Sequence, residues 1–226
     1  MHRKSRPRFV VFGGTFNPIH VGHLEIIRCL SAREDVDQVL VIPAGMSPFK
    51  PAATLLPADL RYRLVREAVS GLARVAVLDL EVRRPPPSRT LETLLELGAL
   101  YPRAELRLAL GQDVYEGFGR WWGAAAILER AGLLVFPRRD APAAPSHPPA
   151  RDGAALPEPW KARARPDATQ RLADPTGRVL AEWVAASIPP VSASTILQAR
   201  DLGQVAPGAR EALAAYWRQE SPVSGP

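Results

Sequence analysis

The sequence is poor in cysteine and has no long apolar run. Across 226 residues the only cysteine is Cys29, so neither an internal disulfide nor a multi-cysteine metal site can form. No window approaches the roughly 18 unbroken apolar residues that a membrane-spanning helix needs. The apolar run near the start, Phe9 to Phe12, is too short for the core of a signal peptide. We therefore expect a cytoplasmic protein without a membrane partner.

Lysine is also scarce. Only Lys4, Lys50 and Lys161 are lysines among 29 basic residues, and the formal net charge is +6. The many arginines are spread along the chain rather than clustered with aromatic side chains. This charge is compatible with a bound nucleotide, and we do not expect a nucleic-acid partner.

Apolar segments alternate with amphipathic ones along most of the chain. Strand-like segments are expected at 8–12, 37–42, 74–82, 104–110, 132–136 and 178–188. Helix-like segments are expected at 21–32, 57–70, 89–100, 113–130, 194–202 and 207–219. This alternation predicts an α/β fold, a Rossmann-like doubly wound parallel sheet of about five to six strands with helices on both faces.

The length predicts a single domain over 1–226. Within it, a Pro/Ala/Arg-rich stretch at about 137–177 has no clear periodicity. We interpret this stretch as a surface excursion, partly mobile, rather than a second domain. In doubly wound sheets ligands bind beyond the carboxyl ends of the strands, so the loops that follow the strands are the place to look for a site.

The first of these loops reads GGTFNPIHVGHL and runs from Gly13 to Leu24. Gly13 and Gly14 let the backbone turn sharply close to a ligand. His20 and His23 are three residues apart, which places them on one face near the start of a helix. A helix N-terminus attracts phosphate by about 0.3–1 kcal/mol, and up to ~2 when partly buried. Imidazole donors on the same face would add hydrogen bonds to phosphate oxygens.

Three other interpretations of this turn compete with a phosphate site. A dinucleotide-binding turn would need the pattern G-x-G-x-x-G, which is absent. A zinc site would need a third protein ligand, and none stands out in the sequence. The third interpretation, that His20 and His23 are simply packed core side chains, stays open on spacing alone.

The turn resembles a known motif. GGTFNPIHVGHL is similar to the G-x-F-x-P-x-H-x-G-H motif of the nucleotidylyltransferase superfamily, whose members transfer a nucleoside monophosphate from a triphosphate and release pyrophosphate. Other segments resemble one branch, the bacterial nicotinate-mononucleotide adenylyltransferases. IPAGMSPFK, from Ile42 to Lys50, is similar to that family's I-P-x-x-x-P-P-H-K loop, with Ser47 and Phe49 as departures. RYRLVREAV, from Arg61, matches the family's arginine-led helix.

Three further segments carry the resemblance. PPSRTLETL resembles the S-Y-T-x-D-T-L segment, with Arg89 in place of tyrosine; on its own residues, Ser88 reads as a helix N-cap. GQDVYEGFGRWW resembles G-x-D-x-x-x-x-F-x-x-W, which places Trp121 at the family tryptophan. VSASTILQARDL resembles I-S-S-T-x-I-R-x-x-L, with Gln198 where the family has arginine and Arg200 two residues further on.

The resemblance implies that AMP passes from ATP to nicotinate mononucleotide, which gives deamido-NAD and pyrophosphate. It implies catalytic roles for His20, His23 and Lys50. It implies ATP contacts from Gly13, Gly14, Thr15, Phe16, His20, His23, Gly111, Asp113, Ser194 and Thr195. It implies mononucleotide contacts from Ala44, Lys50, Ser88, Arg89, Thr90 and Trp121.

No acidic cluster suggests a metal cage, so Mg²⁺ is expected to arrive with ATP. Three alternatives stay open: nicotinamide mononucleotide as acceptor, another phosphorylated acceptor, or a nucleotide-binding homologue that has lost turnover. A homo-oligomer is left open as well.

Overall fold

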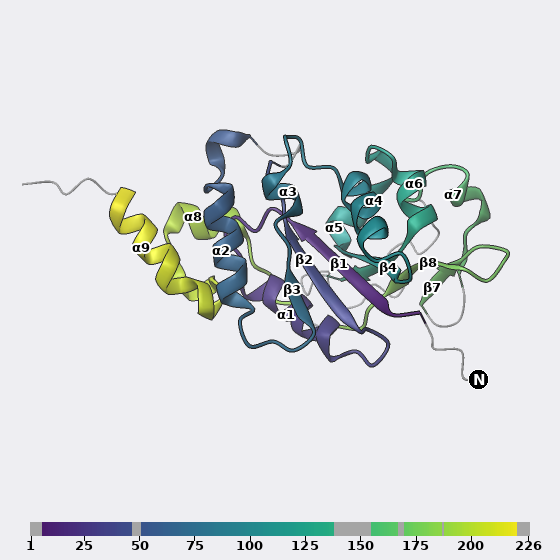
Figure 1. Ribbon diagram of the computed structural model, residues 1–226, viewed down its shortest axis with the longest axis horizontal. Coiled ribbons are helices and arrows are strands. Elements are labelled where there is room, and N and C mark those ends of the chain that lie inside the picture. Colours follow the sequence, from purple (N-terminus) through teal and green to yellow (C-terminus); the bar gives the residue numbers. More distant parts are fainter. Residues whose placement is uncertain (1–5, 47–50, 138–154, 167–169, 187, 221–226) are drawn as a thin grey trace, which may run out of the picture.

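The fold is built around one twisted sheet (Figure 1). A computed structural model describes residues 6–46, 51–137, 155–166, 170–186 and 188–220. In this part of the chain the strand order is β3-β2-β1-β4-β5-β8-β7-β6. The strands are β1 (Arg8–Gly14), β2 (Gln38–Pro43), β3 (Val75–Val77), β4 (Glu105–Gly111), β5 (Ala131–Phe136), β6 (Arg165–Pro166), β7 (Arg171–Ala173) and β8 (Val179–Trp183).

The six strands from β3 to β8 in this order are parallel, and β7 and β6 continue the sheet antiparallel. The chain first adds strands on one side of β1 and then, from β4 onwards, on the other. This reversal lies between β1 and β4, which pair in register from Arg8 to Val11. Ligands of doubly wound sheets bind beyond the carboxyl ends at such a reversal, here next to Gly14 and Gly111.

Helices cover both faces of the sheet, as the sequence predicts. One apolar core lies between the sheet and α1 (Val21–Ala32), α2 (Ala58–Ala68), α8 (Ala193–Ala199) and α9 (Arg210–Glu220). The other lies under α4 (Thr90–Leu100), α6 (Ala124–Arg130) and α7 (Trp160–Arg163). Figure 1 shows α2, α8 and α9 together at one end of the molecule and α4, α6 and α7 towards the other. Short helices α3 (Leu80–Arg83) and α5 (Gln112–Tyr115) follow β3 and β4.

Short 3-10 turns complete the backbone, namely η1 (Ala52–Thr54), η2 (Phe118–Arg120), η3 (Leu202–Gln204) and η4 (Pro207–Ala209). The long helix expected at 113–130 is divided into α5, η2 and α6. None of the helices in the described ranges is long and apolar enough to cross a membrane.

Two expected strands are too long in the sequence-based prediction. The strand expected at 74–82 ends at Val77, and the chain then enters α3, where the amide of Arg83 donates to the carbonyl of Asp79 (3.0 Å). The alternation of polar and apolar residues over 78–82 resembles a strand, but Glu81 is buried and its carboxylate is hydrogen-bonded by α4, which a continued edge strand would not provide. The strand expected at 178–188 likewise ends at Trp183.

The described part of the Pro/Ala/Arg-rich stretch carries more regular structure than its composition predicts. It forms α7, β6 and β7, and it buries Leu156, Trp160 and Leu172 in the second core. These apolar residues are spaced irregularly among prolines and arginines, so no helical or strand period reveals them. The stretch therefore extends the sheet by two strands beyond the expected number.

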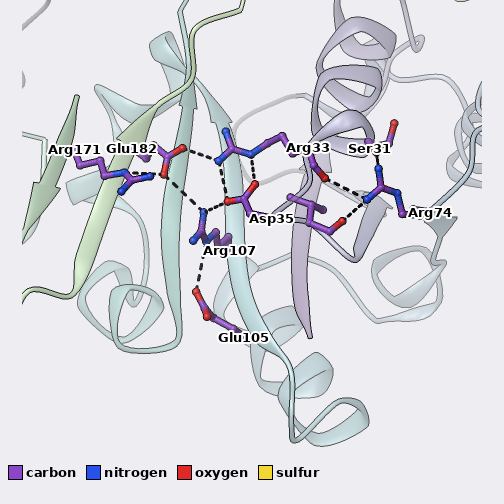
Figure 2. A network of polar contacts seen from close by, with 9 residues as sticks. Ser31, Arg33, Asp35, Arg74, Glu105, Arg107, Arg171 and Glu182 are labelled. Carbon is purple, nitrogen blue, oxygen red and sulfur yellow. Dashed lines mark hydrogen bonds and ion pairs between the residues drawn. The ribbon is translucent and has the colours of Figure 1, made fainter. Parts of the chain in front are cut away.

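A network of charged side chains ties the segment after α1 to β4, β7 and β8 (Figure 2). Glu182 of β8 is buried, and its carboxylate accepts from Arg33 (2.8 Å) and Arg171 (3.2 Å), with Arg107 at 3.8 Å. Arg33 also bonds Asp35 through two nitrogens, at 2.8 and 3.0 Å. The hydrogen bond from Arg33 holds the pKa of Asp35 below its ordinary value. The network joins the end of α1 to β4 and β8.

Candidate functional site

The turn after β1 is tightly packed against its own side chains. A Cβ atom on Gly14 would lie 3.0 Å from the ring of Phe16, so a larger residue here would require the ring to shift. Phe16 has a positive φ of 47° and is almost wholly buried. Gly13 is exposed and Thr15 half-buried. The predicted ATP-binding residues of this loop thus divide into a buried support, Phe16, and a backbone that reaches the surface.

The side chain of Asn17 holds the turn after β1 in place through two hydrogen bonds. Its side-chain amide donates to the carbonyl of Thr54 (3.0 Å) and its side-chain oxygen accepts from the amide of Leu56 (2.7 Å). Asn17 is 6% exposed, so both bonds are made away from water. Buried polar groups are costly unless they are satisfied, and here both ends of the amide are. The turn after β1 is therefore joined to the segment that leads into α2.

His20 and His23 lie together at the start of α1. His20 is the N-cap; its Nδ1 accepts from the amide of His23, and Nδ1 of His23 accepts from the amide of His20, both at 3.4 Å. The two rings stack with centroids 3.6 Å apart and an interplanar angle of 20°. Because each Nδ1 acts as an acceptor, the Nε2 atoms carry the N–H donors of the rings. The spacing of three predicted this shared face, and the structure brings the pair together.

The chain returns to this point near its carboxyl terminus. The amide of Ala206 donates to the carbonyl of Ile19 (3.2 Å), and His20 forms an isolated bridge with Val205. A Cβ on Gly22 would lie 3.1 Å from the carbonyl oxygen of Pro189, so this glycine admits the strand-to-helix segment before α8. The segments on both sides of α8 thus pack beside the start of α1.

Helix α8 starts one residue earlier than predicted. Its N-cap is Ser192, whose hydroxyl accepts from the amide of Thr195 (3.5 Å), so neither Ser194 nor Thr195 is itself the cap. Ser194 and Thr195 lie in the first turn and are exposed. Arg200 ends the helix with a φ of 49°, and its guanidinium lies 5.8 Å from the ring centroid of Trp217 in α9.

The loop after β2 is joined to the turn after β1. The amide of Ala44 donates to the carbonyl of Gly14 (2.9 Å). Ser88 then holds the rest of the loop, because its hydroxyl accepts from the amides of Gly45 (3.0 Å) and Met46 (3.3 Å). The prediction that Ser88 caps the following helix is wrong: the N-cap of α4 is Arg89, without a side-chain cap bond. The hydroxyl is committed instead to a loop more than forty residues away in sequence. Lys50 and Phe49 lie outside the described residues.

Sequence reasoning did not include Arg61 among the site residues. Arg61 is 1% exposed, and its guanidinium donates to the carbonyls of Thr15 (2.7 Å), Ala44 (2.6 Å), Gly45 (2.7 Å) and Leu56 (2.9 Å). Burial lowers the pKa of this arginine from its ordinary value. The sequence does carry a signal, because Arg61 stands on the apolar face of α2 between Leu60 and Leu64.

Glu81 lies against the loop after β2. Its carboxylate accepts from the hydroxyl of Thr93 (2.7 Å), which in turn accepts from Arg84 (3.1 Å). Burial raises the pKa of Glu81, and hydrogen bonds from Thr93 and Ser88 oppose this effect. A Cβ on Gly45 would lie only 2.2 Å from the carbonyl oxygen of Glu81, so α3 and the loop after β2 touch through their backbones.

Two tryptophans and an arginine lie on the α4 side of the sheet. Trp121 is half-buried, with its ring centroid 5.6 Å from that of Phe118. Trp122 is 56% exposed, and the guanidinium of Arg89 lies 4.5 Å from its ring centroid. Thr90 is the first residue of α4. Three of the residues predicted for the mononucleotide, Arg89, Thr90 and Trp121, therefore border the start of α4 and the turn before α6.

Gly111 ends β4 at the topological reversal. A Cβ there would lie 2.7 Å from Oδ1 of Asp113, so the carboxylate folds back over the glycine. Asp113 is in α5 and is exposed. Among the described residues no group of three or more His, Cys, Asp or Glu side chains is arranged to hold a metal ion.

The fold and these loops define a class, a doubly wound α/β domain with a histidine pair at the first helix. Comparison with known proteins narrows this class. Residues 11–199 match the family described as cytidylyltransferase-like. The chain belongs to this family.

Individual relatives are similar over part of the chain. A probable nicotinate-nucleotide adenylyltransferase of Maridesulfovibrio salexigens is 39% identical over 131 residues, which cover 58% of this chain and 61% of that protein. One from Bacteroides fragilis is 40% identical over 128 residues, which cover 57% and 64%. The matched region thus spans less than two thirds of the length of these relatives.

A solved structure shows the fold over nearly the whole chain. The nicotinic acid mononucleotide adenylyltransferase of Plasmodium falciparum complexed with NaAD is 15% identical, with a TM-score of 0.61 over 93% of this chain and 96% of that one. At this identity the likeness concerns the mixed α/β architecture alone.

Proposed function

We propose that this protein transfers AMP from Mg-ATP to nicotinate mononucleotide, forming deamido-NAD and releasing pyrophosphate, a reaction of NAD biosynthesis. The observation that carries the proposal is the stacked pair His20 and His23 at the start of α1, beside the carboxyl end of β1. The relatives named nicotinate-nucleotide adenylyltransferase support the choice of reaction.

In the proposed reaction a phosphate oxygen of the mononucleotide attacks the α-phosphorus of ATP. A new P–O bond forms in line with the bond to the bridging oxygen, which breaks and leaves with pyrophosphate. The nucleophile is already an anion, so no general base is needed. Holding two reactants in line contributes about 7–11 kcal/mol to lowering the barrier. The remaining task of the protein is to neutralise charge on the phosphates.

Each residue around the turn has a proposed part in that task. The Nε2 donors of His20 and His23 and the amides at the start of α1 bind the triphosphate and the charge that develops on pyrophosphate. The hydroxyls of Ser194 and Thr195 approach the same phosphates, since the segment before α8 packs against Gly22. Gly13, Gly14, Thr15 and Gly111 supply close backbone approach, Phe16 supports the turn, and Asp113 accepts from the ribose. Lys50 steers the incoming phosphate.

The acceptor is proposed to lie beside α4. Trp121 offers a face for the pyridine ring, and offset stacking adds about 0.5–1.5 kcal/mol beyond burial. The guanidinium of Arg89 lies 4.5 Å from the ring centroid of Trp122, and its N–H groups are proposed to recognise a ring carboxylate. Ser88, Thr90 and Ala44 complete the pocket wall. Arg89 favours the nicotinate form over the nicotinamide form.

Mg²⁺ is proposed to enter with ATP, held by phosphate oxygens, because the described residues offer no protein cage. We further propose that the chain works as one domain in the cytoplasm. Whether it does so as a homo-oligomer is decided by measuring its mass in solution.

The test is pyrophosphate release from Mg-ATP with four acceptors, namely nicotinate mononucleotide, nicotinamide mononucleotide, phosphopantetheine and glycerol phosphate. Release confined to the two pyridine nucleotides, and faster with the acid, supports the proposal. Release with either of the other acceptors changes the substrate class. Binding of ATP without release for any acceptor identifies a homologue that has lost turnover, and Gln198 in place of the family arginine would then be the first position to restore.

A further inference from the structure

Arg61 differs from the other buried charged groups of the molecule. Its guanidinium is 1% exposed and makes four hydrogen bonds, all of them to backbone carbonyl oxygens. Within the described residues no carboxylate lies at ion-pair distance from it. A buried charge is retained only where its hydrogen bonds are well satisfied, and replacing it is costly. The four carbonyls belong to three separate segments, so the guanidinium connects these segments by hydrogen bonds.

One nitrogen of Arg61 connects the loop after β1 with the loop after β2. Nη1 of Arg61 donates both to Thr15 (2.7 Å) and to Ala44 (2.6 Å), which stand at the carboxyl ends of β1 and β2. Nη2 continues to Gly45 (2.7 Å), and Nε reaches Leu56 (2.9 Å) ahead of α2. Thr15 belongs to the loop proposed to bind ATP, and Ala44 to the loop proposed to bind the mononucleotide.

We infer that Arg61 is a positioning residue that sets the separation between the ATP loop at Thr15 and the acceptor loop at Ala44 and Gly45. This inference rests on the proposed function. Its physical basis is that the two reactants of an in-line transfer lie on different loops. Each loop can bind its own ligand alone, but the reaction depends on the distance between them. A misplacement of about 1 Å costs on the order of 100-fold in rate.

Lysine at position 61 would keep the positive charge but lose the planar guanidinium with its several N–H donors. An ammonium group is a compact donor that cannot reach carbonyls on three segments in a planar arrangement. For Arg61→Lys we expect kcat to fall about 100-fold. The dissociation constants of a non-reactive ATP analogue and of nicotinate mononucleotide, each measured alone by calorimetry, should change less than about threefold. A residue that only stabilises the fold would not produce this split.

Arg74, an exposed arginine with a similar set of acceptors, provides a control. It too donates to three backbone carbonyls, those of Ser31, Arg33 and Val36, but at the amino end of the sheet. Arg74→Lys should lower the thermal midpoint and leave kcat unchanged. Equal kcat losses in the two variants, or an Arg61→Lys enzyme within about threefold of the wild-type kcat, would overturn the inference.

A second variant covers the case in which Arg61→Lys fails to fold. Gly45→Ala leaves the guanidinium in place but puts a Cβ 2.2 Å from the carbonyl oxygen of Glu81, so the acceptor loop must shift. The same kcat loss with unchanged separate affinities is expected. An unchanged kcat in Gly45→Ala would contradict the inference.

Hydrogen exchange tests the role of Arg61 independently of the proposed function. The amide of Ala44 is bonded to the carbonyl of Gly14, and its exchange should speed up in Arg61→Lys but not in Arg74→Lys. If the wild type transfers no AMP, the proposed function fails, while the exchange rates still decide whether Arg61 holds the loops. Unaltered exchange at Ala44 would overturn the inference by itself.

Discussion

At the carboxyl end of α1, Arg33, Arg107 and Arg171 surround the carboxylate of Glu182, whereas at the carboxyl ends of β1 and β2 the hydrogen bonds of Arg61 go to backbone carbonyls. Together with Asp35 and Glu105, the first arrangement balances three arginines with three carboxylates, and it fastens β4 and β8 to the end of α1 (Figure 2). The second leaves a positive charge beside two loops. A ligand rich in phosphate would gain from such a positive charge. The comparison therefore predicts a contribution to stability at one end and the proposed anion binding at the other.

The largest effect is expected at the histidine pair. His20→Asn keeps a good N-cap for α1, because asparagine is among the preferred N-cap residues, but it removes the imidazole. Loss of a donor to developing charge should lower kcat about 10²–10³-fold in the pyrophosphate assay. The thermal midpoint should stay near that of the wild type.

His20→Ala serves as the control for the cap. It should lose the same activity and about 1 kcal/mol of stability in addition. A His20→Asn enzyme with full activity would show that the imidazole is a packed core group and that the site lies elsewhere.

The next effect is on stability at the opposite end. Glu182→Gln removes the carboxylate that three arginines share, and its side chain is only 9% exposed. We expect the free energy of unfolding to fall by about 2–3 kcal/mol in urea titration, with kcat per folded molecule unchanged. Glu129→Gln, which breaks a more exposed pair with Arg130, should change stability by less than about 0.5 kcal/mol. A loss of kcat in Glu182→Gln would abolish the division between the two ends.

A smaller effect concerns the choice of acceptor. Arg89→Ala should lower kcat/KM for nicotinate mononucleotide about tenfold, since a charge-assisted hydrogen bond to the ring carboxylate is lost. The value for nicotinamide mononucleotide should stay within about twofold. Arg83→Ala, at an exposed arginine paired with Asp79, is the neighbouring control. Equal losses for acid and amide would show that Arg89 supports the pocket without reading the carboxylate.

The smallest effect is a pH dependence at Glu81. Burial raises the pKa of this carboxyl in the folded state, so the folded chain binds the proton more tightly than the unfolded chain. Its contribution to stability is therefore fully present below the unfolded pKa and is lost as the pH rises through the folded pKa. Unfolding of the wild type relative to Glu81→Gln, measured from pH 4 to pH 8, should show this decline. A rising difference would mean that the hydrogen bonds from Thr93 and Ser88 outweigh burial.

The sequence predicts much of the fold because most elements have a clear period. Leu60, Leu64 and Val65 mark the buried face of α2 by their spacing alone, and the strands β1, β2, β4 and β5 appear within a residue or two of their predicted bounds. It does not predict β6 and β7, because their few buried residues lie among prolines and arginines without a period.

The geometry of the candidate site was predictable where its residues are close together in sequence. The pairing of His20 with His23 follows from a spacing of three residues on one helix turn. The roles of Ser88 and Arg61 could not be found in this way, since their partners at Gly45 and Thr15 are about forty residues distant in sequence. A polar side chain within an apolar helix face, as at Arg61, is the signal that was available.

The most direct test of the division between the two ends is calorimetric titration of α,β-methylene ATP into three proteins, namely the wild type, His20→Asn and Glu182→Gln. We predict that the wild type and Glu182→Gln bind equally and that His20→Asn binds at least about tenfold more weakly, as the loss of a charged hydrogen bond requires. Equal binding by all three proteins, or a loss in Glu182→Gln as large as that in His20→Asn, would contradict the account.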